Sequence, residues 1–366
     1  MSTLKTTNLQ HASAGSPAIV LASDGTATAQ LSSLNGGPLA GARNRIINGD
    51  MRIDQRNAGA SVSMTAGGVF GTDRWQGFED SDGTMTMQQS TVAPAGHTNS
   101  LLLTTGTADS SLTGSQGAVI LQSIEGFNTA DLAWGTASAQ AITLSFWVRS
   151  SLTGTFGGSL RNSGSSRSYV FSYSISAANT WEYKSITISG DTSGTWLADN
   201  GQGINVTFSL GAGPTISGTA GSWSSSNLAS ANGATSVIGT NGATFYITGA
   251  QLEPGSVATP FERRSYGQEL ALCQRYTRKI TNATVSTFST TTAVYSNNSW
   301  PMRALPTSTL ITNGQLTGNN SNNNVTGISG PTGDGDGFYF DVSSTGLTAT
   351  ASYNLRGTLI ILSAEL

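Results

Sequence analysis

The sequence predicts a mainly β protein in which a β-sandwich is followed by a short helix and a small C-terminal β domain and is preceded by an extended N-terminal arm. Three observations predict this fold class. The chain has 45 glycines among 366 residues, a composition that favours short strands and tight turns. Several segments alternate apolar and polar side chains with a period of two, as half-buried strands do. Only one segment, starting at Ser265, has helical features.

The first element, residues 1–43, has few large apolar residues and no helical period, so it cannot easily fold by itself. We expect an extended arm that gains structure by laying strands against a partner or against sister subunits. The expected docking residues are Ile19, Val20 and Leu21. The apolar run around them is too short for a signal sequence or a membrane span, which predicts a protein made in the cytoplasm and not inserted in a membrane.

The second element, residues 44–261, is predicted to be the sandwich because its strand-like segments are separated by glycine- and asparagine-containing turns. Three strands carry the prediction most clearly. Their expected inward-facing residues are Ile142, Leu144, Phe146 and Val148; Tyr169, Phe171, Tyr173 and Ile175; and Ile204, Val206, Phe208 and Leu210. In the first of these strands, Trp147 and Arg149 are expected on the opposite face.

A cluster of charged residues opens the predicted sandwich, in a chain of which only 10% of residues are charged. Arg52, Asp54 and Arg56 alternate with Met51 and Ile53, so we expect them on one face of the first strand while the apolar pair faces the core. We interpret the cluster as ion pairs that fix the junction of arm and sandwich, either within one chain or between subunits. A solvated edge strand and a receptor contact remain alternatives.

The third element, residues 262–280, contains the helical segment. Ser265 and Gln268 have the spacing of a capping box, and the segment predicts a linker helix of about three or four turns. A self-associating helix is the alternative. Residues 281–366 again have strand patterns and form the predicted C-terminal domain. A domain of about 80 residues without a disulfide or metal is often marginally stable, so we expect this unit to associate with copies of itself.

Composition narrows the classes of function. The formal net charge of −3 gives no field that would attract nucleic acid or an anionic membrane. Cys273, His11 and His97 cannot supply an ordinary zinc site, and Asp334 and Asp336 lack the spacing of a calcium loop. We therefore expect no metal and no cofactor.

The chain also resembles a known family. The arm, NRIINGDMRIDQRNAG, FGTDRWQGF, LSFWVRSS, TWEYKSITISGD, GAQLEPGSVATPFERRSYGQELALCQRY and the closing LSAEL occur in an order that is similar to tail-fibre and related receptor-binding proteins of tailed bacteriophages. The resemblance implies a jelly-roll sandwich similar to carbohydrate-binding modules. It also implies a homotrimeric fibre whose N-terminal arm docks on the virion, on a tail or portal-proximal adaptor protein.

Binding of a glycan is the chemical role that these residues favour. Sugars stack an apolar face on an aromatic ring while amides and carboxylates bond the hydroxyls. The candidate binding residues, for which core or interface positions are the alternative, are Trp196, Trp223, Tyr295, Asn297 and Trp300. Catalysis is not expected, because no motif predicts a pair of carboxylates among Glu125, Asp131, Glu182 and Asp191.

The sequence therefore predicts a non-enzymatic structural virion protein, a homotrimeric tail (side) fibre that recognises host cell-surface polysaccharide or lipopolysaccharide. Two alternatives stay open. One is a head fibre or capsid decoration protein with the same folds, and the other is a glycan-degrading tailspike.

Overall fold

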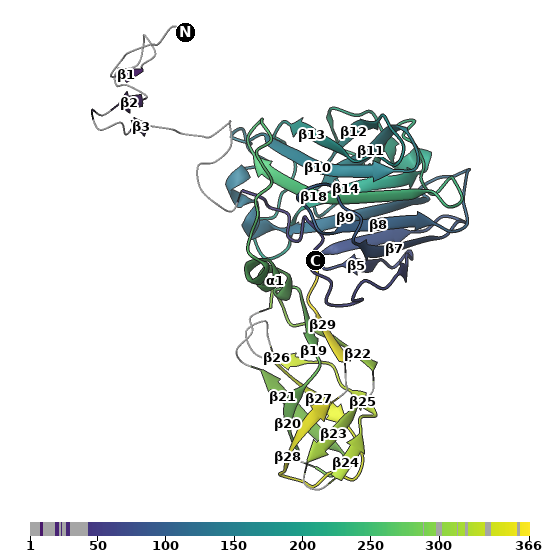
Figure 1. The fold of residues 1–366 in the computed structure, drawn as a ribbon, viewed down its shortest axis with the longest axis vertical. Coiled ribbons are helices and arrows are strands. Elements are labelled where there is room, and N and C mark those ends of the chain that lie inside the picture. The colour runs from purple at the N-terminus through teal and green to yellow at the C-terminus, as the bar shows by residue number, and fades with distance from the viewer. Residues whose placement is uncertain are drawn as a thin grey trace.

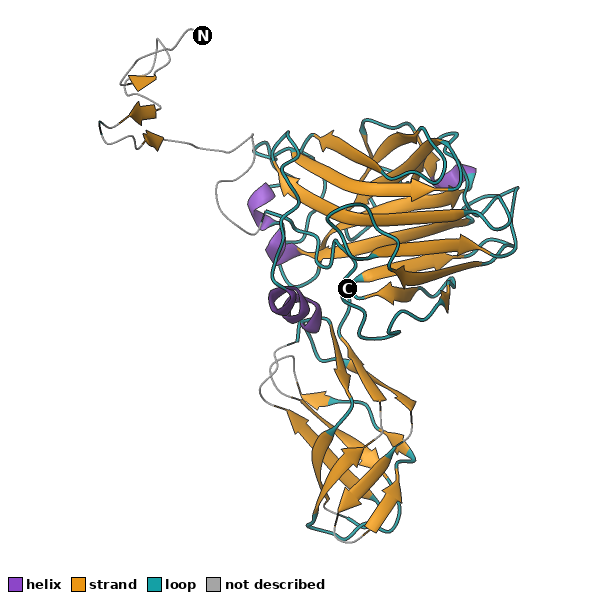
Figure 2. Cartoon of the chain, in the orientation of Figure 1, coloured by secondary structure: helices purple, strands orange, loops and turns teal. Residues whose placement is uncertain are grey.

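A computed structural model describes residues 8–9, 19–21, 23, 27–29 and 43–366, the last range without 288, 298–301, 313, 319–320, 334–337 and 357–358. The predicted fold class is confirmed: the described residues are mainly β, with a sandwich, one short α-helix and a C-terminal β unit (Figure 1; Figure 2). No helix in the described residues is long and apolar enough to cross a membrane.

Two facing sheets form the sandwich. The six-stranded sheet has the order β13-β10-β18-β8-β7-β4 and the seven-stranded sheet the order β16-β12-β11-β14-β9-β6-β5. The chain crosses repeatedly between them, as in a jelly roll. The strands of the first sheet are β4 Val62–Ser63, β7 Met85–Ser90, β8 Ser100–Thr105, β10 Ile142–Ser150, β13 Glu182–Ile188 and β18 Thr244–Pro254. Those of the second are β5 Val69–Thr72, β6 Trp75–Glu79, β9 Gly117–Glu125, β11 Gly154–Arg161, β12 Ser168–Ile175, β14 Gln202–Ala212 and β16 Trp223–Ser224.

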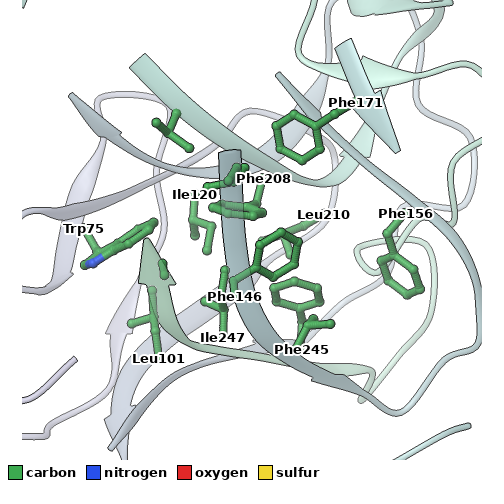
Figure 3. Packing of buried hydrophobic residues seen from close by; sticks show 14 of the residues in the cluster. Trp75, Leu101, Ile120, Phe146, Phe156, Phe171, Phe208, Leu210, Phe245 and Ile247 are labelled. Atoms are coloured by element: carbon green, nitrogen blue, oxygen red, sulfur yellow. The ribbon is translucent and has the colours of Figure 1, made fainter. Parts of the chain in front are cut away.

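The core lies between these sheets, and Figure 3 shows aromatic and aliphatic side chains from both of them meeting there. Phe146 of β10 packs edge-to-face on Phe208 of β14, with ring centroids 4.9 Å apart. All twelve residues predicted to face inward in the three strands are buried. The period-two pattern therefore identified the core faces correctly.

The segment that enters the sandwich is irregular, and here the prediction of a first strand through residues 51–56 is wrong. Met51 and Ile53 are buried as expected, but the backbone turns. The side chain of Asn48 accepts a hydrogen bond from the Ile53 N–H at 2.9 Å and donates to the Ile53 carbonyl at 2.8 Å. The Ile53 carbonyl also accepts a hydrogen bond from the Asp73 N–H at 3.1 Å, so both backbone groups of Ile53 are satisfied without a regular strand ladder.

Short elements complete the sandwich. The 3₁₀ turns η1 Gly126–Asn128 and η2 Ala130–Leu132 follow β9. A segment after β14 carries η3 Pro214–Ile216 and the parallel pair β15 Ser217–Gly218 and β17 Ser230–Ala231. This segment, residues 213–231, lies directly against β11. The contact is so close that a Cβ atom added at Gly157 of β11 would be only 2.6 Å from the Ala231 nitrogen.

Helix α1, Tyr266–Gln274, lies between the sandwich and the C-terminal unit (Figure 1). The predicted capping box of Ser265 and Gln268 is present. The helix has nine residues and is shorter than predicted, because the end of the 262–280 segment is strand β19, Thr277–Ile280. β19 pairs with the last strand of the chain, and this pairing replaces the last turns of the expected helix.

The C-terminal unit has its own buried core, which includes Val285, Leu316, Phe340 and Leu355. A three-stranded sheet has the order β19-β29-β22, and β20, β21, β23–β28 form an eight-stranded one. Their bounds are β20 Ala283–Thr287, β21 Thr292–Asn297, β22 Thr307–Thr312, β23 Gln315–Gly318, β24 Ser321–Asn324, β25 Gly327–Ile328, β26 Thr332–Gly333, β27 Phe338–Ser343, β28 Ser352–Arg356 and β29 Leu359–Ser363.

In the N-terminal arm, the described residues form a small antiparallel sheet. Its strands are β1 Asn8–Leu9, β2 Ile19–Leu21 and β3 Ala27–Ala29, with β2 in the centre. The three predicted docking residues, Ile19, Val20 and Leu21, make up β2, and their backbones pair with β1 and β3. Their docking role stays a prediction.

Candidate functional site

A concave site of a size suited to a ligand lies on the outer face of the seven-stranded sheet, the side opposite the core. We call it the outer-face pocket, a hollow of about 350 Å³ lined by Ala66, Phe78, Asp80, Ser115, Gly117, Val119, Leu121, Arg161, Ile216, Asn227 and Ala229. The neighbouring strands β6, β9 and β14 run beneath it, β11 supplies Arg161, and segment 213–231 supplies Ile216, Asn227 and Ala229. The pocket lies within the usual size range of small-ligand sites, about 300–1,000 Å³.

Strand periodicity places an apolar floor in this pocket. In β9, Ala118 and Ile120 face the core, so Val119 and Leu121 face outward. Phe78 of β6 is directly opposite Val119 in the strand register. The result is one aromatic and two aliphatic side chains side by side, the kind of apolar surface on which one face of a sugar ring can pack.

Polar groups border the floor. The Arg161 guanidinium donates to Asn227 Oδ1 at 3.0 Å and to Thr207 Oγ1 at 3.1 Å. Asp80, at the rim, is exposed and accepts a hydrogen bond from the Gly117 N–H at 2.8 Å. An apolar floor with amide, guanidinium and carboxylate groups around it can hold a molecule that has both an apolar face and hydroxyl groups.

Aromatic side chains also gather on the outer face of the other sheet. Trp147 lies 5.4 Å from Tyr183 between ring centroids, and Trp181 lies 6.1 Å from Tyr246. Trp147 is on the outer face as predicted, since its neighbours Phe146 and Val148 are in the core.

Trp196 and Trp223, two of the predicted glycan-binding residues, pack together with Trp134 instead of standing apart. The ring centroids in this trio are 4.7–5.5 Å apart, and all pairs are edge-to-face. The Trp223 N–H donates to the Ser189 carbonyl, and the Trp196 N–H to the Ser193 carbonyl. The hollow beside the trio has a volume of only about 50 Å³. This geometry favours the alternative that the sequence left open, a packing role, and ligand contact by these two residues stays a prediction.

The remaining glycan-site candidates lie in the C-terminal unit. Tyr295 is buried, and its ring centroid lies 5.0 Å from that of Phe340. Its ring is therefore part of the core and is not exposed for stacking on a sugar. Asn297 ends β21, opposite Phe338, and its side chain lies outside the described residues, as does Trp300. A broad hollow over β20 and β28, of about 720 Å³, has no aromatic residue in its described lining.

The charged cluster at the entry segment joins different parts of the chain from those predicted. Arg52 pairs with Asp50 at 2.5 Å, and Asp54 accepts hydrogen bonds from the Asn57 and Gly59 N–H groups. Arg56 reaches Glu365, which follows the last strand, at 3.0 Å. Within the chain, Arg56 therefore connects the sandwich to the segment leaving the C-terminal unit, and a role of the cluster at the junction of arm and sandwich stays a prediction.

Each of the four carboxylates considered above as candidates for catalysis forms an ion pair. These pairs are Glu125–Arg275 at 2.5 Å, Asp131–Arg45 at 2.5 Å, Glu182–Lys184 at 2.7 Å and Asp191–Arg167 at 2.7 Å. Burial raises the pKa of Glu125, but hydrogen bonds from Arg275 and Tyr276 outweigh burial and lower it overall. The described residues include no group of three His, Cys, Asp or Glu that could hold a metal, and Asp334 and Asp336 are not among them.

Sequence reasoning missed the outer-face pocket. One signal was available: in GAVILQSIE the residues of both faces of β9 are apolar, and a strand that is apolar on both faces must be covered on both. Arg161 gave no such signal, because its surroundings come from segment 213–231 and from β14, 44 or more positions away.

No protein-family model and no curated protein matches this chain. Among solved structures, it is similar to the enzymatically active domain of bacteriophage CBA120 tailspike protein 4, with 13% identity, a TM-score of 0.30 and coverage of 61% of this chain and 23% of that one. It is also similar to a family 11 carbohydrate-binding module from Clostridium thermocellum in complex with a β-1,3-1,4-mixed-linked tetrasaccharide. The identity is 10%, the TM-score is 0.27, and the match covers 52% of this chain and 96% of that one. A third similar structure is that of a putative sugar binding protein from Bacteroides thetaiotaomicron, with 12% identity, a TM-score of 0.34 and coverage of 58% of this chain and 100% of that one. The chain thus spans about a quarter of the tailspike's length and nearly all of the two smaller proteins.

Proposed function

We propose that the chain is a structural virion protein of a tailed bacteriophage, a homotrimeric tail (side) fibre that binds glycan on the host surface. In this proposal, residues 1–43 dock on a tail or portal-proximal adaptor protein. The sandwich binds polysaccharide or lipopolysaccharide in the outer-face pocket. The ordered set of motifs quoted above supports the phage assignment, and the pocket supports the glycan assignment.

The observation that carries glycan binding is the pairing of an apolar floor with polar walls. The C–H groups on one face of a sugar ring pack well on an aromatic side chain such as Phe78. Asp80 and Asn227 are placed at the border, where hydroxyl groups of the same ring would lie. Three copies in one fibre would raise a low affinity per site through effective concentration.

The test is binding of the full chain to a panel of immobilised oligosaccharides and host-envelope polysaccharides. We expect Phe78→Ala to weaken binding at least tenfold and Tyr183→Ala to leave it unchanged. Tyr183 is a matched control because it is an exposed aromatic residue on the outer face of the other sheet. Loss of binding in Tyr183→Ala alone would move the site to that sheet, and no binding to any glycan would refute glycan recognition.

A further inference from the structure

Arg161 carries a charge that no acidic side chain balances. Its three hydrogen-bond acceptors are Asn227 Oδ1, Thr207 Oγ1 and Asn205 Oδ1, and all belong to neutral side chains. Among the described residues no carboxylate lies within 4.0 Å of its guanidinium. Asp80, the acidic residue in the pocket lining, is exposed at the rim and bonded to the Gly117 N–H.

The donor count of Arg161 is also incomplete. A guanidinium has five N–H groups, and the acceptors above engage three of them. Its Nε is buried with no partner in the described part of the chain. Burial lowers the pKa of Arg161, whereas the hydrogen bonds that Arg167 and Arg275 donate to carboxylates raise the pKa of these two residues. A partly desolvated cation without a counter-charge is unfavourable unless something else supplies the negative charge.

We propose that the outer-face pocket takes an acidic sugar, whose carboxylate or phosphate group lies against Arg161 while its ring packs over Phe78, Val119 and Leu121. This inference rests on the proposed glycan-binding function and names the class of glycan. The shared chemistry is one negative charge next to a ring. Asp80 at the rim favours hydroxyl groups at its side of the pocket and thereby orients the charged end toward Arg161.

A purely structural role for Arg161 would look different in solution. In that case the guanidinium would only tether Asn227, and with it segment 213–231, to the sheet. Loss of the guanidinium would then weaken the binding of neutral and acidic sugars by the same factor. The ratio of acidic to neutral affinity separates the two roles, because only a direct contact with the anion changes that ratio.

The experiment is saturation-transfer NMR on the full chain with D-glucuronate, D-galacturonate, N-acetylneuraminate and glucose 6-phosphate, against neutral D-glucose and D-galactose. We expect at least one acidic sugar to bind tenfold more tightly than the neutral sugars. Comparing the affinities of the three carboxylate sugars with that of glucose 6-phosphate shows whether the pocket prefers a carboxylate or a phosphate group. Arg161→Gln should remove that preference and Arg161→Lys should restore part of it. Arg149→Gln, on the outer face of the other sheet, should leave it unchanged.

Two outcomes overturn the inference without touching glycan binding: equal affinity of the wild-type chain for acidic and neutral sugars, and an acidic preference that survives in Arg161→Gln. The wild-type comparison needs no variant, so a folding defect in Arg161→Gln leaves the test intact. If the immobilised glycan panel shows no binding at all, the proposed function and this inference fail together.

Discussion

Arg56 and Glu365 form an ion pair at 3.0 Å across 309 residues of sequence. Both side chains are largely buried, with exposed fractions of 12% and 8%. Arg74 also pairs with Glu365, and its guanidinium lies 3.5 Å from the ring centre of Tyr276. The sandwich therefore holds the chain where it returns from the C-terminal unit, and this contact predicts a pH-dependent junction.

Glu365→Gln should destabilise the full chain at neutral pH. Burial raises the pKa of Glu365, but the charges of Arg74 and Arg56 outweigh it, so the pKa lies below the ordinary 4.5. A lowered carboxyl pKa contributes stability that is present above about pH 4.5 and is lost as the pH falls through the folded-state value. We expect a loss of about 3 kcal/mol at pH 7, shrinking below pH 4.5, in urea unfolding followed by circular dichroism.

Asp131→Asn is the control for that prediction. Asp131 pairs with Arg45 at 2.5 Å, but its side chain is 57% exposed, so this variant should lose no more than about 1 kcal/mol. Equal losses in the two variants, or a Glu365→Gln loss that does not change with pH, would contradict the account of the junction.

Gly49→Ala should destabilise the sandwich through its backbone. A Cβ at this position would lie 2.1 Å from the Ala250 carbonyl oxygen in β18, so the entry segment would have to move away from that strand. We expect a loss of about 3 kcal/mol in the free energy of unfolding. Gly267→Ala in α1 is the matched control. It has open space around it, and alanine should stabilise the helix by up to about 1 kcal/mol.

Trp223→Ala and Phe78→Ala should change different properties of the protein, its stability in the first variant and its glycan affinity in the second. Trp223 packs against the core and in the tryptophan trio, so its removal should lower stability by about 2 kcal/mol, less than the loss for a fully buried aromatic residue. Glycan affinity of the remaining folded protein should be unchanged. Phe78→Ala should weaken glycan binding with little change in melting temperature. The reverse pattern would return the site to the predicted tryptophans.

Deletion of residues 1–43 tests the proposed arm. We expect the shortened chain to remain soluble and to keep its oligomeric state by light scattering, because the described sandwich and C-terminal cores lie outside that segment. Incorporation into virions should be lost. A monomeric full-length chain would refute the fibre, and normal incorporation of the shortened chain would refute docking by the arm.

The sequence by itself determined which faces of the strands are buried. Ile204, Val206, Phe208 and Leu210 alternate with polar residues, and a pleated strand sends alternate side chains to opposite faces whatever its neighbours are. The capping box of Ser265 and Gln268 is equally local, since its atoms lie within one helical turn.

Only the tertiary structure decided what covers the other faces and which charges meet. Asn205 and Thr207 alternate with these core residues and are polar, yet both are buried, and Arg161 lies against them. The partner of Arg56 comes from the far end of the chain. The Asn48 side chain, which bonds the backbone of Ile53, also donates a hydrogen bond to the Asp73 carbonyl, 25 positions away. Periodicity reports how a strand faces its own sheet, whereas the positions of segments distant in sequence follow from the packing of the whole chain.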